Sequence, residues 1–258
     1  MNILLTNDDG IYADGISAMY LALIRAGHEV RVVAPNSERS AVGHAITVFD
    51  SLKVFDVNIE GRISGTAVNG TPADCVKLAV NALMPVKPDL VISGINRGAN
   101  TGNHVIYSGT VSAATEAAMS RLPAMAVSLD IVSTKKETHD FRHAADYAVT
   151  LAEKIAQRGL PVGTLLNVNV PEREASAIKG ARLAKLARFF LIDVYEARLD
   201  PFERTYYWPK LEQIEVTDAE GVDVDYRLVK DGYVVITPIQ YDLTDYRMLE
   251  ALRAWNLE

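Results

Sequence analysis

The amino-acid sequence predicts an α/β protein built on a mostly parallel sheet. Short apolar runs alternate with segments that carry apolar residues at helical spacing over residues 1–170, as expected for strands and helices in alternation. The length of 258 residues, with 49% hydrophobic and 23% charged residues, is ordinary for one α/β domain with a sizeable core.

The first part of the chain reads as strand, loop, helix and strand. Residues 1–7 form a short apolar run, and residues 16–26 have apolar side chains at helical spacing before Gly27. The run "EVRVVA", residues 29–34, predicts a second strand that Pro35 ends. This order is a βαβ unit, which implies parallel strands joined by a right-handed crossover.

The alternation continues to about residue 170. The segment at residues 46–68 is expected to be extended, and Thr71 with Pro72 has the form of an N-cap and first residue of a helix. We expect helices at residues 72–83, 111–120 and 141–158, and strands at residues 89–94, 124–129 and 164–170.

After Pro171 the α/β pattern stops and aromatic residues accumulate. This region predicts β-ribbon extensions, which are marginal alone and whose aromatic side chains suit a subunit interface, unless they fold back on their own sheet. A strand at residues 232–239 and a C-terminal helix at residues 245–257 follow. We therefore expect one domain, residues 1–258, with a core at 1–180, a β-ribbon oligomerisation extension at 181–232, and the return strand and helix at 233–258.

Charge and composition exclude several classes of protein. The net charge of −7 and a pI of about 5.3 argue against a surface that coats a nucleic-acid polymer. The single cysteine, Cys75, forms no internal disulfide. The chain starts without a signal-peptide pattern, and no apolar run approaches the roughly 20 residues that span a bilayer. We expect a cytoplasmic protein without a membrane partner.

Four polar loops are candidates for a functional site, and three of them follow predicted strands. Strand ends in a parallel sheet meet at one edge, where ligands bind. Asp8 and Asp9 are adjacent there, and their repulsion requires a cation, a helix N-terminus or solvent. Taken singly, each loop also fits an ordinary turn or cap. The loops are residues 7–10, 35–44, 93–102 and 107–110.

The available side chains favour a hard cation over zinc. The five histidines show no zinc-type spacing such as H-E-x-x-H. Oxygen donors suit Mg²⁺ or Mn²⁺. The oxygen donors in the loops are Asp8, Asp9, Ser40 and Asn96.

The fourth loop resembles both a helix cap and an anion site. Ser108, Gly109 and Thr110 precede a predicted helix, whose N-terminal N–H groups attract anions. The P-loop motif, G-x-S-x-G, and G-x-G-x-x-G after the first strand are all missing from the sequence. The remaining combination fits metal-assisted hydrolysis of a phosphate ester.

Several motifs in a fixed order resemble the SurE family (survival protein E), which are metal-dependent nucleoside monophosphate phosphatases. The motifs are "ILLTNDDGI", "VVAPNSERSAVGHAIT", "GTPADCVKLA", "DLVISGINRGANTG" and "YSGTVSAATEA", followed by "LLNVNVP", "YYW" and "GYVVITPI". They cover nearly the whole chain. One departure is Ala99, where many members of the family have proline.

The resemblance implies a Rossmann-like three-layer core with C-terminal extensions used in homodimers or tetramers. It implies one Mg²⁺ or Mn²⁺ per subunit and hydrolysis of 5′-nucleotides, with 3′-nucleotides and polyphosphate as further substrates in some members. The implied metal ligands are Asp8, Asp9, Ser40 and Asn96, of which Asp8, Asp9 and Asn96 are the predicted catalytic residues. The predicted phosphate-binding residues are Gly43, Asn100, Ser108, Gly109 and Thr110.

The residues alone leave other functions open. A nucleotide-binding regulator without turnover would keep the anion loops, and a glycosyltransferase-like protein that binds a sugar nucleotide would also begin with βαβ units. The sequence also does not decide whether Asp8 or Asp9 orients or deprotonates the attacking water. Metal-dependent release of phosphate from a nucleoside monophosphate separates the phosphatase from both alternatives.

Overall fold

A computed structural model of the chain describes residues 1–59, 63–131, 138–219 and 221–255. Within these residues the strands are β1 (Asn2–Thr6), β2 (Glu29–Pro35), β3 (Val54–Ile59), β4 (Ile63–Val68), β5 (Leu90–Arg97), β6 (Ala124–Asp130), β7 (Thr164–Pro171), β8 (Ala181–Leu183), β9 (Phe189–Leu199), β10 (Thr205–Val216) and β11 (Val234–Gln240). The helices are α1 (Asp14–Arg25), α2 (Pro72–Leu78), α3 (Gly109–Met119), α4 (Arg142–Arg158), α5 (Asp225–Lys230) and α6 (Tyr246–Arg253), with short helical turns η1 (Ala79–Leu83), η2 (Gly102–Ile106) and η3 (Ala175–Ala177).

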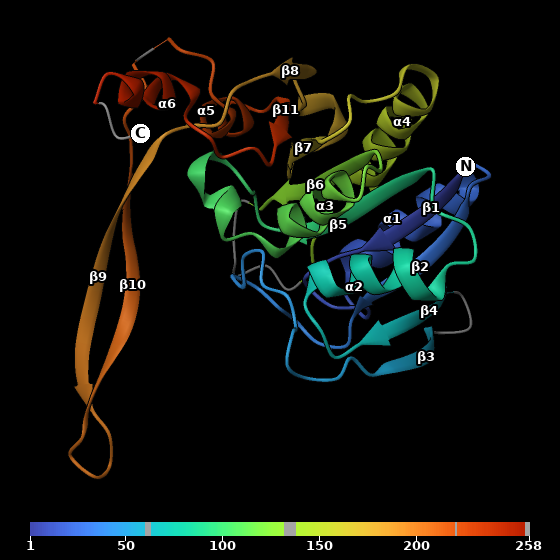
Figure 1. Cartoon of the computed structure of the whole chain (residues 1–258), viewed down its shortest axis with the longest axis horizontal. Coiled ribbons are helices and arrows are strands. Elements are labelled where there is room, and N and C mark those ends of the chain that lie inside the picture. The colour runs from blue at the N-terminus through green and yellow to red at the C-terminus, as the bar shows by residue number, and fades with distance from the viewer. Residues whose placement is uncertain (60–62, 132–137, 220, 256–258) are drawn as a thin grey trace.

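A twisted sheet with helices on both faces forms the body of the molecule (Figure 1). Its strand order in the described residues is β3-β4-β2-β1-β5-β6-β7-β11-β8. The strands from β4 to β7 pair in parallel, whereas β3 and β11 pair antiparallel with β4 and β7. The predicted mostly parallel α/β fold is confirmed.

Side-chain alternation in the strands divides the core into two layers. Ile3 and Leu5 of β1 pack in one cluster with residues of α1 and α4, whereas Leu4 packs in a second cluster with residues of α2 and α3. Successive side chains of a strand point to opposite faces, so a strand buried on both faces reads as a continuous apolar run. The three-layer core follows from this arrangement.

The chain leaves β1 and β5 toward opposite faces of the sheet. After β1 it enters α1 on one face, and after β5 it passes through η2 into α3 on the other. Because β1 and β5 are neighbours, a crevice opens between the two diverging loops at their carboxyl ends. The fold therefore provides a ligand site where the sequence places Asp8, Asp9 and Asn96.

Strand β5 runs further than the prediction of residues 89–94. It reaches Arg97, with an irregular register against β6 between Ser93 and Asn96. Gly94 allows this because its φ is +138° and a Cβ there would lie 2.3 Å from the carbonyl oxygen of Val127. Part of the glycine-rich segment expected to be a loop is therefore a bulged strand end.

The predicted helix at residues 72–83 begins as expected and changes form inside. Thr71 caps α2 through a capping box: its hydroxyl accepts from the Asp74 N–H at 3.1 Å, and the Asp74 carboxylate accepts from the Thr71 N–H at 2.9 Å. The regular helix ends at Leu78, and one π-helical turn, η1, completes the segment.

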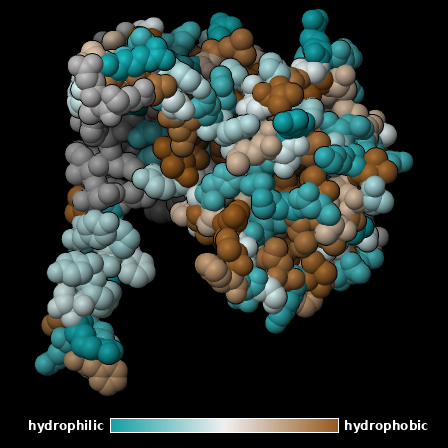
Figure 2. Space-filling model, viewed as in Figure 1, coloured by the Kyte–Doolittle hydropathy of each residue, from teal (hydrophilic) through white to brown (hydrophobic). Residues whose placement is uncertain are grey.

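The C-terminal part contains the expected ribbon and two further elements. Strands β9 and β10 form a two-stranded antiparallel hairpin that stands away from the body (Figure 1 and Figure 2). The extension at residues 181–232 also contains β8, which joins the main sheet, and helix α5. Strand β11 returns to the sheet as predicted, and α6 follows, although residues 256 and 257 of the predicted C-terminal helix lie outside the described residues.

No helix in the described ranges combines the length and apolar character required to cross a membrane.

Candidate active site

Asp8 lies at the end of β1 and is almost fully buried, with 4% of its surface exposed. The hydroxyl of Thr110, at the start of α3, donates a hydrogen bond to Asp8 Oδ1 at 2.5 Å. Burial and, to a smaller extent, the neighbouring Asp9 raise the pKa of Asp8 to about 6, although the Thr110 hydrogen bond acts in the lowering direction. The carboxylate is thus held in a place that disfavours its charge.

Asp9 is held from the third loop. The backbone N–H of Arg97, at the end of β5, donates to Asp9 Oδ2 at 3.0 Å. Burial and the nearby Glu38 raise the pKa of Asp9, while the contacts with Arg97 lower it. Both adjacent carboxylates therefore have raised pKa values, and burial is the main cause in each.

The N-terminus of α3 packs directly on Asp8. A Cβ at Gly109 would lie 2.7 Å from the Cβ of Asp8, so the first residue of α3 has no room for a side chain. Ser108 is the N-cap, and its hydroxyl oxygen accepts from the Val111 N–H at 3.1 Å. The predicted anion site and the predicted metal site are therefore adjacent.

The second loop contacts both neighbours. The backbone N–H of Arg39 donates to the carbonyl oxygen of Asp8 at 2.7 Å, and the N–H of Gly43 donates to the carbonyl of Tyr107 at 3.0 Å. Ser40 is exposed, and its hydroxyl donates to Glu38 Oε1 at 2.6 Å. The backbone of Gly43 thus links the second loop to the fourth.

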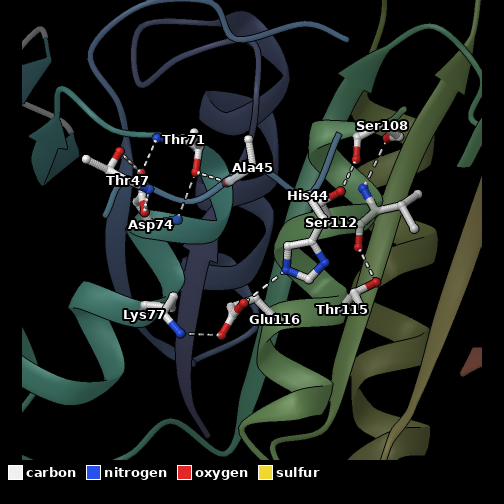
Figure 3. Close-up of polar contacts among 11 residues, drawn as sticks. His44, Ala45, Thr47, Thr71, Asp74, Lys77, Ser108, Ser112, Thr115 and Glu116 are labelled. Carbon is white, nitrogen blue, oxygen red and sulfur yellow. Dashed lines mark hydrogen bonds and ion pairs between the residues drawn. The ribbon is translucent and has the colours of Figure 1, made fainter. Parts of the chain in front are cut away.

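A buried glutamate fixes the second loop to α3. His44 Nε2 lies 3.0 Å from Glu116 Oε2, and Lys77 of α2 lies 3.2 Å from Glu116 Oε1 (Figure 3). Glu116 is 5% exposed, and its hydrogen bond with His44 lowers its pKa against the effect of burial. The helix that carries Ser108 to Thr110 thus also holds the loop that carries Ser40.

The same loop is fixed a second time at the cap of α2. The Asp74 carboxylate accepts from the backbone and hydroxyl of Thr47 at 2.9 and 2.7 Å, and Thr71 donates its hydroxyl to the carbonyl of Ala45 at 2.7 Å (Figure 3). The hydrogen bonds from Thr47 lower the pKa of Asp74 despite its burial. A polar loop without regular structure is in this way positioned on two helices.

Asn96 and Asn100 have different environments. The Asn96 side-chain amide donates to the Gly98 carbonyl at 2.7 Å, which orients Oδ1 away from that contact. Asn100 is anchored to β6 and β7: its amide donates to Ser128 at 2.9 Å, and its N–H donates to Asn169 at 2.8 Å. The prediction that Asn100 binds phosphate stays a prediction, while its observed role is to anchor the loop.

A pocket of about 530 Å³ opens beside Asp9. Asp9, Glu38 and Ser40 line it at one side, and Ala13 to Gly15 at the start of α1 form another wall. His139 and Phe141 line the pocket as well. The pocket extends from the predicted metal ligands and is large enough for a small organic group.

The donor set fits a hard divalent cation. Asp8 accepts a hydrogen bond through Oδ1 from the Thr110 hydroxyl, and Asp9 accepts one through Oδ2 from the N–H of Arg97. Among the described residues no three His, Cys, Asp or Glu side chains form a metal-binding group. Ser40 and Asn96 carry neutral oxygens of the kind that Mg²⁺ and Mn²⁺ accept, and their assignment as ligands stays a prediction.

The sequence pointed to the four loops but missed several contacts. The role of the Thr110 hydroxyl toward Asp8 and of the Arg97 N–H toward Asp9 depends on residues far apart in sequence. The contacts of Glu116 with His44 and Lys77 could have been suspected from the local sequence. Glu116 is the one acidic residue among small and apolar residues in "VSAATEAAM". A charge in such a helix must find a partner if the helix is buried.

Comparisons with known proteins agree with the motifs. Residues 3–191 match the family profile described as survival protein SurE. A 5′-nucleotidase SurE from Syntrophobacter fumaroxidans is 48% identical over 257 residues, with 100% of both chains covered. A second, from Symbiobacterium thermophilum, is 48% identical over 257 residues, covering 99% of this chain and 98% of the relative.

A solved structure has the same fold. The crystal structure of SurE protein from Aquifex aeolicus superposes with a TM-score of 0.82 at 35% identity, covering 99% of this chain and 100% of that chain. The resemblance first seen in the motifs is confirmed.

Proposed function

This chain belongs to the survival protein SurE family, and we propose that it hydrolyses nucleoside 5′-monophosphates to nucleoside and phosphate with a divalent metal ion. The observation that carries the proposal is the buried Asp8, whose pKa is raised to about 6, in contact with the N-terminus of α3. A bound cation would compensate the negative charge of Asp8, and a bound phosphate would compensate the positive end of α3. The alternative of a non-catalytic regulator finds no support, since the relatives are named as 5′-nucleotidases.

The chain binds the phosphoryl group at the start of α3. The N–H of Gly109 and the positive end of the helix attract a phosphate oxygen. Ser108 uses its oxygen to cap Val111, and its hydroxyl hydrogen is available to donate to the substrate. Thr110 contributes differently, because its hydroxyl donates to Asp8 and fixes the orientation of that carboxylate.

We assign Asp8, Asp9, Ser40 and Asn96 as the residues that hold one Mg²⁺ or Mn²⁺. The ion would supply positive charge to the phosphoryl group and would acidify the attacking water. Asp9 lines the pocket and would orient that water. The leaving nucleoside would occupy this pocket, which two of the proposed ligands, Asp9 and Ser40, line.

The test is phosphate release from 5′-AMP by the purified protein. We expect release with Mg²⁺ or Mn²⁺, loss of release in EDTA, and recovery when the metal is added back. The variant Asp9→Asn should be inactive, whereas Asp56→Asn, the same change on the exposed surface of β3, should behave as wild type. Full activity in EDTA, or an active Asp9→Asn variant, would exclude the metal-dependent mechanism. Including 3′-AMP and polyphosphate in the assay defines the substrate range.

We also propose that the β9–β10 hairpin forms a subunit interface, giving a homodimer or tetramer. Several of its side chains are exposed in one chain, among them Phe202 at 78% and Trp208 at 58%. An exposed aromatic surface of this kind is typical of an interaction site. A cytoplasmic location accords with nucleotide substrates and with the single, buried cysteine.

Shortening the hairpin tests the interface. Replacing residues 197–207 by a two-residue turn removes the hairpin end, where Asp200 and Arg204 close the turn, and leaves the sheet intact. Light scattering should report at least a dimer for the wild type and a smaller assembly for the shortened variant. A wild-type protein that is monomeric at micromolar concentration would refute the interface.

A further inference from the structure

Asp225 is a fully buried carboxylate that the proposed chemistry does not use. It is the first residue of α5 and is 0% exposed. Burial raises its pKa, and the backbone N–H groups around it lower the pKa in the opposite direction. A carboxylate in such a place is retained only where it makes several good hydrogen bonds.

The hydrogen bonds of Asp225 connect two distant parts of the molecule. Oδ2 accepts from the N–H of Gly102, the first residue of η2, at 2.8 Å. Oδ1 accepts at 2.8 Å from the N–H of Ala187, just before the hairpin strand β9, and at 2.8 Å from the N–H of Tyr226. One side chain thus joins the root of the hairpin to the turn that precedes α3.

The turn after Gly102 leads directly to the phosphate end of α3. Within it the N–H of Tyr107 donates to the carbonyl of His104 at 2.9 Å, and the N–H of Ser108 donates to the carbonyl of Val105 at 3.3 Å. These bonds make η2 and the N-cap of α3 one continuous unit. The position of Gly102 therefore determines the position of Ser108.

We propose that Asp225 is a positioning residue that fixes η2 and, through it, the phosphate-binding N-terminus of α3. The inference rests on the proposed function, because that function places a phosphate at Ser108 and Gly109. Of the two carboxylates proposed as metal ligands, Asp9 is held by the N–H of Arg97, whereas Asp8 is held by Thr110 of α3 itself. Loss of the Asp225 contact should therefore weaken phosphate binding more than metal binding, because only one of the two carboxylates depends on α3.

The variant Asp225→Asn separates the two sides of this contact. An amide has one accepting oxygen, which can face either Gly102 alone or both Ala187 and Tyr226. Keeping two hydrogen bonds is favoured over keeping one, so the amide oxygen continues to accept from the N–H groups of Ala187 and Tyr226. The NH₂ group then faces the N–H of Gly102. Two donors then oppose each other, and η2 loses its anchor.

The experiment measures the inhibition constant of inorganic phosphate, the KM for 5′-AMP, and the Mg²⁺ concentration for half-maximal activity. For Asp225→Asn we expect the first two to rise about tenfold, the effect of losing roughly one hydrogen bond. The Mg²⁺ requirement should rise by a smaller factor than the phosphate inhibition constant, because Asp9 keeps its contact with Arg97 and Asp8 is reached only through Thr110. A merely structural role would shift all three quantities by the same factor.

The control is Asp218→Asn at the hairpin root. Asp218 pairs with Lys185 at 2.7 Å and accepts from the N–H of Arg188 at 2.7 Å, and neither of these two contacts involves η2. It should leave phosphate inhibition unchanged. An equal effect in both variants, or no effect in Asp225→Asn, would overturn the proposal.

A second variant covers the case in which Asp225→Asn does not fold. Val105→Ala loosens η2 from its apolar side, where Val105 is 9% exposed in the core cluster with α3. It should also raise the phosphate inhibition constant by a larger factor than the Mg²⁺ requirement, and the opposite pattern would overturn the proposal. Calorimetry measures phosphate binding at the N-terminus of α3 directly, so it tests the role of Asp225 even if the protein hydrolyses no nucleotide. Absence of hydrolysis would count against the proposed function alone.

Discussion

Replacing Asp8 by asparagine should abolish activity and at the same time stabilise the metal-free protein. Asparagine keeps an oxygen that accepts from Thr110, so the hydrogen bond at 2.5 Å need not be lost. It removes a charge whose burial is unfavourable in the absence of a cation. Loss of function and gain of stability at one residue are typical of a site organised for a ligand.

The size of the gain follows from the pKa of Asp8. Its rise from 3.8 to about 6 is about two units, and at about 1.4 kcal/mol per unit this corresponds to about 3 kcal/mol. For a chain of this size about 1 kcal/mol changes Tm by roughly 2–4 °C, so Asp8→Asn should raise Tm by roughly 6–12 °C.

The gain depends on pH in a defined direction. Because the folded-state pKa is raised, the ionised carboxylate costs stability fully above about pH 6. Between the two pKa values the cost decreases as pH falls, and below the unfolded value of 3.8 it is absent. The difference in Tm between Asp8→Asn and wild type should therefore be largest at pH 8 and about half as large at pH 5.

Thermal unfolding in EDTA at these two pH values, with Asp56→Asn as the exposed control, measures the effect. Adding Mg²⁺ should then raise the Tm of wild type and leave that of Asp8→Asn nearly unchanged. A variant that is less stable than wild type at pH 8 would refute the argument from burial. Near-normal turnover of the variant at saturating Mg²⁺ and Mn²⁺ would refute the assignment of Asp8 as a ligand.

Four further substitutions test the neighbouring contacts. Gly109→Ala places a Cβ 2.7 Å from that of Asp8, and we expect kcat/KM for 5′-AMP to fall at least about tenfold, in line with overpacking costs of about 1–3 kcal/mol; unchanged kinetics would show that Asp8 can shift freely. Ser40→Ala and Asn96→Ala each remove a proposed neutral ligand, so the Mg²⁺ concentration for half-maximal activity should rise while Tm in EDTA changes little. If neither variant alters the metal requirement, the metal lies elsewhere. Glu116→Gln weakens the contacts with His44 and Lys77 that hold the second loop. Activity titrated with Mg²⁺ should then show a metal requirement that is a few-fold higher, because a hydrogen bond contributes about 0.5–1.5 kcal/mol.

The central strands and their flanking helices could be predicted because their signals are local. The run from Ile3 to Leu5 reads as a strand buried on both faces, and the segment after Thr71 has a cap that depends on residues three apart. The order of strands and loops also located the two carboxylates at the carboxyl edge of the sheet, since that edge is fixed by parallel pairing.

Less local features were missed for a physical reason. The continuation of β5 beyond Gly94 depends on the carbonyl of Val127 in another strand, and α5 lies in a region where the aromatic pattern predicted only ribbons. Local periodicity contains no information about which distant backbone approaches a glycine. Such elements are decided when the sheet assembles.

The sequence by itself determined which residues are available to the candidate site and the order in which the chain presents them. Asp8, Asp9, Ser40 and Asn96 were identified from residue type and position after strands. The tertiary structure decided how they are held: Thr110 reaches Asp8 across 102 residues, and Asp225 reaches Gly102 across 123. Composition and spacing act over one or two turns of chain, whereas burial, and therefore the pKa of Asp8, exists only after distant segments have packed around the carboxylate.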